Sequence, residues 1–131
     1  MVLIIGGYAQ GQLEYVEQNY DVAKEKFFDG CLPYTFNTGA GRNQEVVVLM
    51  NLNVWASKEL LANKDPMDRL EEVLKLYPNL ILISDEVGSG IVPMKAEERR
   101  RREDIGHMQV ELAKRADEVV RVVCGIGQKI K

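Results

Sequence analysis

The chain has 131 residues, a typical length for one domain, and we expect residues 1–131 to fold as a single domain. Hydrophobic residues make up 46% of it and charged residues 28%, a balance that argues against disorder of the whole chain. The net charge of −3 argues against a general nucleic-acid binder, because such proteins gather positive charge on one face.

The cysteine content and the apolar runs point to a cytoplasmic protein. Cys31 and Cys124 are too few for a disulfide framework and favour two reduced thiols. The apolar run at residues 2–5 is far too short for a signal peptide or a membrane span, so we expect no membrane partner. His107 is the single histidine, which excludes a zinc site built on several histidines.

The first part of the chain predicts a strand, a helix and an irregular connection. The apolar run at residues 2–5 is typical of a strand that is buried on both faces. Apolar residues then recur in steps of three and four over residues 13–27, which predicts a helix. Residues 28–44 carry scattered glycines and a proline among polar residues and predict an irregular connection.

The rest of the chain continues to alternate between strands and helices. Asp65 is the predicted N-cap of a helix, with Pro66 at the first helical position. Buried strands separated by helices pair in parallel through right-handed crossovers. The sequence therefore predicts an α/β fold, a three-layer sandwich with a mainly parallel sheet. The predicted strands are 46–50, 80–83, 119–123 and a short edge strand at 126–130, and the predicted helices are 54–62, 66–77 and 95–116.

A glycine loop follows the first predicted strand, where ligands bind in such sheets. Residues 6–13 read GGYAQGQL and keep the two glycines of the phosphate-binding pattern G-x-x-x-x-G-K-[ST]. Gln12 stands in place of the lysine and Leu13 in place of the hydroxyl residue. The pattern predicts a degenerate nucleotide-binding loop made of Gly6, Gly7, Gly11, Gln12 and Leu13. The alternative is a tight turn that merely needs glycine.

A second motif resembles one enzyme family. Residues 82–93 read LISDEVGSGIVP and resemble the N-E-V-G-x-G-I-V-P strand and loop of the adenosylcobinamide kinase/adenosylcobinamide-phosphate guanylyltransferases of cobalamin biosynthesis. Residues 101–106 resemble a helix of that family. ADEV at 116–119 and VVCG at 122–125 are similar to its A-D-E-V strand and closing glycine.

The resemblance is good from residue 80 onward, holds in outline over 1–13 and 46–57, and is poor over 14–45. It implies a P-loop NTPase-like topology and a homo-oligomer, usually a trimer. It also implies GTP or ATP with Mg²⁺ as cofactors, and a nucleotide and a corrinoid as binding partners.

The chain departs from the family where the chemistry is done. Family members carry a lysine and a serine where this chain has Gln12 and Leu13. Alignment on Trp55 places Met50 at the family's Walker B aspartate, and a thioether cannot organise Mg²⁺ as a carboxylate does. The family's guanylyl-accepting histidine has no counterpart in residues 14–45. The catalytic residues therefore remain unknown, and no metal ligand is assigned.

Asp85, Glu86, Gly88 and Gly90 form a second candidate contact with a ligand or metal. Both carboxylates follow the strand predicted at 80–83 and could hold Mg²⁺ or accept a hydrogen bond from a ribose or a corrinoid amide. The alternative is a pair that caps the loop. Asp85 stands where the family pattern has asparagine. Gly88 and Gly90 are predicted to serve backbone conformations that side chains disfavour.

Three functions fit these patterns. The first is a degenerate family member that binds a nucleotide or corrinoid weakly, or serves as a regulatory subunit, with little or no kinase activity. The second is an active enzyme with a rearranged site, in which Lys24, Lys26 or Arg42 supplies the positive charge. The third is a non-catalytic, oligomeric interaction module.

Overall fold

The computed structural model describes residues 1–32, 45–87 and 92–131. Gly88 and Gly90 of the second candidate contact lie outside the described residues, as does Arg42. The elements, in chain order, are β1 (Val2–Gly6), α1 (Gln12–Asn19), the 3-10 turn η1 (Lys24–Lys26), β2 (Phe27–Asp29), β3 (Val48–Met50), α2 (Leu52–Leu61), α3 (Pro66–Leu76), β4 (Ile81–Asp85), α4 (Ala96–Arg115), β5 (Glu118–Val123) and β6 (Ile126–Lys129).

In the described residues, six strands form one sheet in the order β2-β3-β4-β1-β5-β6. Every neighbouring pair is parallel except β5 and β6, which form an antiparallel hairpin. β1 lies between β4 and β5, and Gly6 at its end is level with Asp85 and Val122. The mainly parallel sheet confirms the predicted α/β class and is consistent with a P-loop NTPase-like topology.

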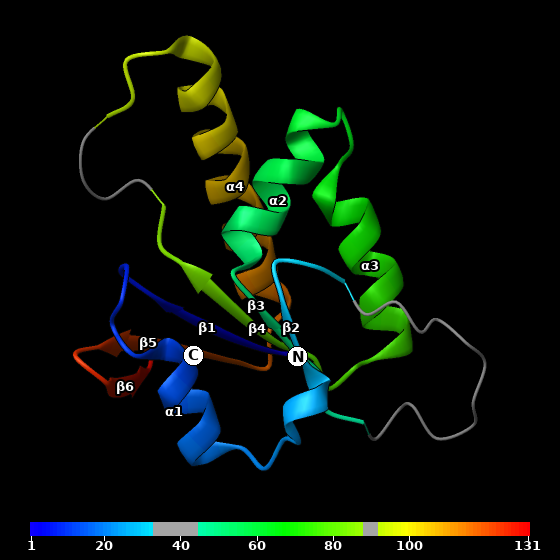
Figure 1. Ribbon diagram of the computed structural model, residues 1–131, viewed down its shortest axis with the longest axis vertical. Helices are drawn as coiled ribbons and strands as arrows, with labels where there is room; N and C mark the ends of the chain where they lie inside the picture. Colours follow the sequence, from blue (N-terminus) through cyan, green and yellow to red (C-terminus); the bar gives the residue numbers. More distant parts are fainter. Residues whose placement is uncertain (33–44, 88–91) are drawn as a thin grey trace.

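Helices cover both faces of this sheet (Figure 1). Successive side chains of a strand point to opposite faces, so each strand contributes to two cores. Ile4 and Val120 pack on one face with Val16 of α1. Leu3 packs on the other face with side chains of α2, α3 and α4. The result is the three-layer sandwich that the sequence predicts.

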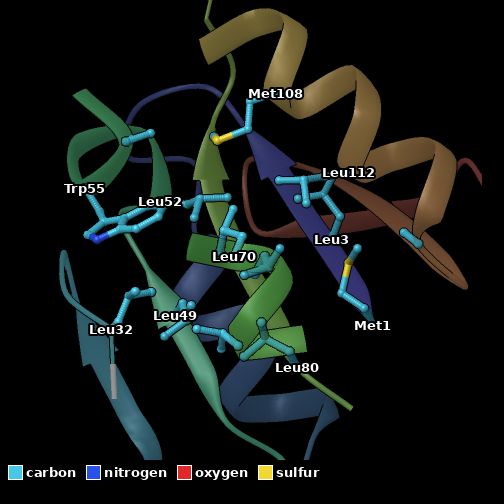
Figure 2. Packing of buried hydrophobic residues seen from close by; sticks show 14 of the residues in the cluster. Met1, Leu3, Leu32, Leu49, Leu52, Trp55, Leu70, Leu80, Met108 and Leu112 are labelled. Atoms are coloured by element: carbon cyan, nitrogen blue, oxygen red, sulfur yellow. The ribbon is translucent and has the colours of Figure 1, made fainter. Parts of the chain in front are cut away.

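The larger core lies between the sheet and helices α2, α3 and α4 (Figure 2). Leu52, Leu70 and Leu112 anchor the three helices there, each with at most 1% of its surface exposed. Burial of a leucine side chain contributes about 1.5–3 kcal/mol relative to an exposed one. Ile105 and Met108 of α4 are also buried, so this helix is anchored to the core from Ile105 to Leu112.

The prediction of one helix over residues 13–27 is wrong. α1 ends at Asn19, and Tyr20 after it adopts an extended backbone conformation. The chain then makes the turn η1 and enters β2, which pairs in parallel with β3 at the sheet edge. Phe27 and Phe28 therefore extend the sheet, and part of the predicted irregular connection is a strand. Aromatic residues favour strands, and pairing with β3 outweighs the helical spacing.

The helices also bear on the predicted N-cap at Asp65 and on the question of a membrane span. The side chain of Asp65 accepts a hydrogen bond of 2.9 Å from the backbone N–H of Met67, which confirms it as the N-cap of α3. None of the helices in the described ranges combines the length and the apolar character that a membrane span requires.

Candidate functional site

The glycine loop joins β1 to α1, and two of its glycines have structural reasons of their own. A Cβ atom on Gly6 would lie 2.6 Å from the backbone carbonyl oxygen of Val122 in β5. Gly11, the N-cap of α1, has a φ of 88°, which favours glycine. The close approach of β5 thus requires a glycine at position 6, and the left-handed turn favours one at position 11. Neither reason involves a ligand.

The side chain of Gln12 is buried inside the loop, with 6% of its surface exposed. Its Nε2 atom donates to the backbone carbonyl of Gly7 at 2.8 Å and to Oδ1 of Asp85 at 3.3 Å. The structure thus brings together residues from both candidate contacts. At the position that the glycine pattern assigns to the P-loop lysine, this chain thus has a neutral amide that is already bonded within the protein.

A second tether holds the tip of the loop, and nothing in the sequence pointed to it. Gln10 accepts two backbone hydrogen bonds from the turn between β5 and β6. The N–H of Cys124 donates to Gln10 Oε1 at 2.9 Å, and the N–H of Gly125 donates to the Gln10 main-chain carbonyl at 2.8 Å. Cys124 and Gly125 both have positive φ angles, which turn their N–H groups toward the loop.

A cleft of about 360 Å³ opens beside the loop, and we call it the P-loop cleft. Gly11, Leu13 and Met50 line it, and its charged lining side chains among the described residues are Glu14 and Asp85. Burial raises the pKa of the Asp85 carboxyl. The cleft therefore presents carboxylates, whereas the phosphates of a nucleoside triphosphate need positive charge around them.

These residues do not fit the magnesium site of a P-loop enzyme. Leu13 and Met50, which the resemblance aligns with the hydroxyl and carboxylate ligands of that site, line the cleft and offer no side-chain oxygen. Within the described part of the chain, no three histidine, cysteine, aspartate or glutamate side chains gather where they could hold a metal ion.

The side chain of Glu86 bonds to a different strand. Its backbone N–H donates to the Gly6 carbonyl at 2.7 Å, so the main chain does meet the glycine loop. Its carboxylate accepts from Arg121 of β5, at 2.6 Å from Nε and 3.3 Å from Nη2. This hydrogen bond raises the pKa of the Arg121 guanidinium. Glu86 is thus part of an ion pair, and Asp85 is the carboxylate that reaches the P-loop cleft.

The lysines considered for a rearranged site do not line this cleft. Lys26 forms an ion pair of 3.3 Å with Glu45, and Lys24 lies beside it in η1. The cleft therefore has no positive side chain among its described lining residues.

A comparison with known families settles where the chain belongs. A family model described as "Cobinamide kinase / cobinamide phosphate guanyltransferase" matches residues 32–130, more than half of the chain. The chain belongs to this family. The match begins after the glycine loop and includes β4, Asp85 and Glu86, so family membership rests on the part of the chain that follows the loop.

Two curated relatives share part of the sequence. Both are named bifunctional adenosylcobalamin biosynthesis protein CobU, one from Salmonella typhimurium (strain LT2) and one from Escherichia coli (strain K12). Identity over 52 residues is 48% with the first and 46% with the second. The matched stretch covers 40% of this chain but only 29% of each relative.

Proposed function

We propose that this family member acts in cobalamin biosynthesis as a weak nucleotide- or corrinoid-binding subunit, possessing little or no kinase activity. The observation that carries this proposal is the buried Gln12 amide, bonded to Gly7 and Asp85 where a kinase needs a free cationic side chain. On the resemblance to the family alone, we further propose a homo-oligomer, usually a trimer in that family. From the two cysteines, which favour reduced thiols, we propose a cytoplasmic protein.

Phosphoryl transfer needs charge that this cleft does not supply. P-loop enzymes stabilise the transferred group with a lysine and Mg²⁺, and the protein contributes mainly positioning and electrostatics. Here the lysine is replaced by a neutral amide, and Glu14 and Asp85 would repel a polyphosphate. Loss of both positive charges predicts a rate lower by orders of magnitude.

Weak binding of a phosphate is still supported by the backbone. α1 begins at Gln12, directly after the glycine loop, and Gly11 and Leu13 line the cleft. The first N–H groups of a helix attract anions because they have no partner within the helix. This attraction acts without a side-chain cation, so the binding we propose does not depend on Mg²⁺.

A thermal-shift titration with GTP, ATP and cobinamide, each with and without Mg²⁺, tests the proposal together with a nucleotide-turnover assay. Ligand at a hundred times its dissociation constant stabilises the fold by about 2.7 kcal/mol. We expect a shift that is the same with and without Mg²⁺, and no turnover. Mg²⁺-dependent turnover with cobinamide would favour the rearranged enzyme. No response to any ligand would favour the interaction module.

A gain-of-charge variant sharpens this test. The triple substitution Gln12→Lys, Leu13→Ser and Met50→Asp introduces the side chains that the resemblance to the family assigns to these positions. We expect the triple variant to bind GTP or ATP more tightly, and in a manner that depends on Mg²⁺. Gln12→Lys alone is the matched control, because its ammonium would pair with Asp85 and leave the magnesium ligands missing.

A further inference from the structure

We propose that a pocket between β1 and α4 binds a small molecule that has an apolar body and an anionic group. The pocket, here called the α4 pocket, is lined by residues of β1 and α4. Helix α4 covers the opposite face of the sheet from α1 (Figure 1). The pocket is separate from the P-loop cleft, and no described residue lines both. Its apolar wall includes Leu3, Ile5, Val87, Pro93, Val110 and Ala113.

The size and walls of the α4 pocket suit a small-molecule site. Its volume is about 640 Å³, within the roughly 300–1,000 Å³ that such sites occupy. Apolar side chains at its mouth remain in water, since Val110 is 53% exposed and Val92 67% exposed. A ligand with an apolar body would remove this surface from water, which is the main source of affinity in such sites.

Gly106 lines the α4 pocket, and the described residues around it give no steric reason for a glycine there. It lies inside α4, where glycine is about 1 kcal/mol less favourable than alanine. Outside the helix's own backbone, an added Cβ would meet just one described atom, Cγ2 of Val87, at an ordinary contact distance of 3.5 Å. The described neighbours of Gly106 would therefore accept a Cβ atom here. The glycine instead leaves the space on the pocket side of α4 free.

Cationic groups at the rim select the charge of the ligand. Arg99 and Arg102 line the pocket together with Glu103 and His107. Nη1 of Arg99 also donates to the carbonyls of Pro93 at 2.9 Å and Met94 at 2.7 Å. A guanidinium has five N–H donors, so an arginine fixed in this way can still donate to an anion. The two guanidinium groups favour a carboxylate, sulfonate or phosphate over a neutral group.

Hydrogen bonds of Gln109, which lines the α4 pocket, hold α4 against β4. Nε2 of Gln109 donates to the backbone carbonyl of Asp85 at 2.7 Å and to Oγ of Ser84 at 2.8 Å. These bonds join α4 to the end of β4. A pocket whose walls are fixed before binding loses less entropy when a ligand binds.

Two fluorescent probes test this assignment on the whole chain. The anionic probe 1-anilinonaphthalene-8-sulfonate has an aromatic body and a sulfonate, and N-phenyl-1-naphthylamine has the same body without the charge. We expect saturable binding at one site per chain, with the anionic probe bound about tenfold more tightly, as one charge-assisted hydrogen bond provides. Arg102→Gln should reduce that preference. Equal affinity for the two probes would overturn the assignment of an anionic ligand.

Filling the pocket should abolish probe binding. Gly106→Leu places a side chain in the free space, and Gly106→Ala adds one methyl group as the matched control. A second variant, Val110→Glu, sets a carboxylate at the half-exposed mouth and should fold normally. Val54→Glu is its control, because Val54 is 44% exposed on α2 and does not line the pocket. We expect at least about a tenfold loss of affinity in Gly106→Leu and Val110→Glu, and none in the controls.

Two outcomes would overturn the assignment. Unchanged probe binding in both Gly106→Leu and Val110→Glu would place the probe elsewhere. Absence of probe binding, together with oligomers that dissociate on Gly106→Leu in analytical ultracentrifugation, would show that a second copy of the chain covers the pocket. The response to GTP should be the same in Gly106→Leu and the unmodified chain, so failure here is distinguishable from failure of the proposed function.

Discussion

The P-loop cleft and the α4 pocket lie at the two faces of one sheet and differ in how their polar groups are satisfied. In the P-loop cleft, Gln12 already bonds to Gly7 and Asp85, so a ligand must compete with bonds inside the protein. The wall of the α4 pocket is largely apolar, and a ligand there displaces water. The polar groups of the glycine loop thus hold parts of the fold together. The surface that is more open to a ligand lies on the other face of the sheet.

The largest loss of stability should come from Gly6→Ala, which disturbs the glycine loop beside the P-loop cleft and does not touch the α4 pocket. The new Cβ would lie 2.6 Å from the Val122 carbonyl oxygen and 2.9 Å from Nε2 of Gln12. The backbone of β5 cannot move away without loss of strand pairing, so we expect a loss of about 3 kcal/mol in the free energy of unfolding, measured with urea.

Gly7→Ala is the control for that measurement. Its Cβ would meet Cγ of Gln10 at 3.5 Å, an ordinary contact, and should change stability by less than about 0.5 kcal/mol. Equal losses in the two variants would show that β5 does not press on the loop. In Gly6→Ala the α4 pocket should keep its affinity for the anionic probe.

Much of the fold could be predicted because its signals are local. Each buried strand is a short apolar run, and the Asp65-Pro66 pair marks a helix start by its own chemistry. The end of α1 could not be predicted, because Phe27 fits a helical stripe as well as a strand. Only pairing with β3, which lies far along the chain, decides between them.

The candidate site also has a part that local sequence signals predict and a part that depends on contacts far along the chain. The spacing of Gly6, Gly11 and Gln12 located the loop, because glycine preferences act within a few residues. The bond from Gln12 to Asp85 spans 73 residues, and that from Cys124 to Gln10 spans 114. No sequence pattern encodes either bond. Only the structure shows that the side chains of Gln10 and Gln12 are already bonded to distant parts of the chain.

Gln12→Ala should give the next largest effect. It removes a buried amide that bonds to Gly7 and Asp85, and leaves both acceptors without this donor. We expect a loss of about 2 kcal/mol in the free energy of unfolding. Gln18→Ala on the exposed side of α1 is the matched control and should change stability little. A neutral result for Gln12→Ala would mean that water replaces the amide freely, and that the cleft is more open than its bonding indicates.

Gln10→Ala should loosen the tip of the loop with a smaller effect, about 0.5–1 kcal/mol. It removes the Oε1 acceptor of the Cys124 N–H but keeps the main-chain carbonyl that accepts from Gly125. Amide hydrogen exchange should therefore become faster at Cys124 than at Gly125. Equal acceleration at both amides would show that the side chain holds the whole turn in place.

The smallest effect concerns Asp85→Asn, and it depends on pH. Burial raises the pKa of Asp85 above the ordinary value of 3.8, so the folded state binds this proton more tightly than the unfolded state. Its contribution to stability is then greatest below that value and is lost as pH rises through the folded pKa. The stability of Asp85→Asn relative to the unmodified chain should accordingly increase from about pH 4 to about pH 7 in urea titrations.

The same substitution separates the two binding surfaces. Asparagine keeps an oxygen for the Gln12 amide but removes a negative charge from the P-loop cleft, so GTP should bind more tightly. Among the described residues, Asp85 does not line the α4 pocket, and its backbone carbonyl, which accepts from Gln109 of that pocket, is unchanged. Probe affinity should therefore stay constant. A parallel change in both affinities would mean that the end of β4 transmits charge or strain between the two faces of the sheet.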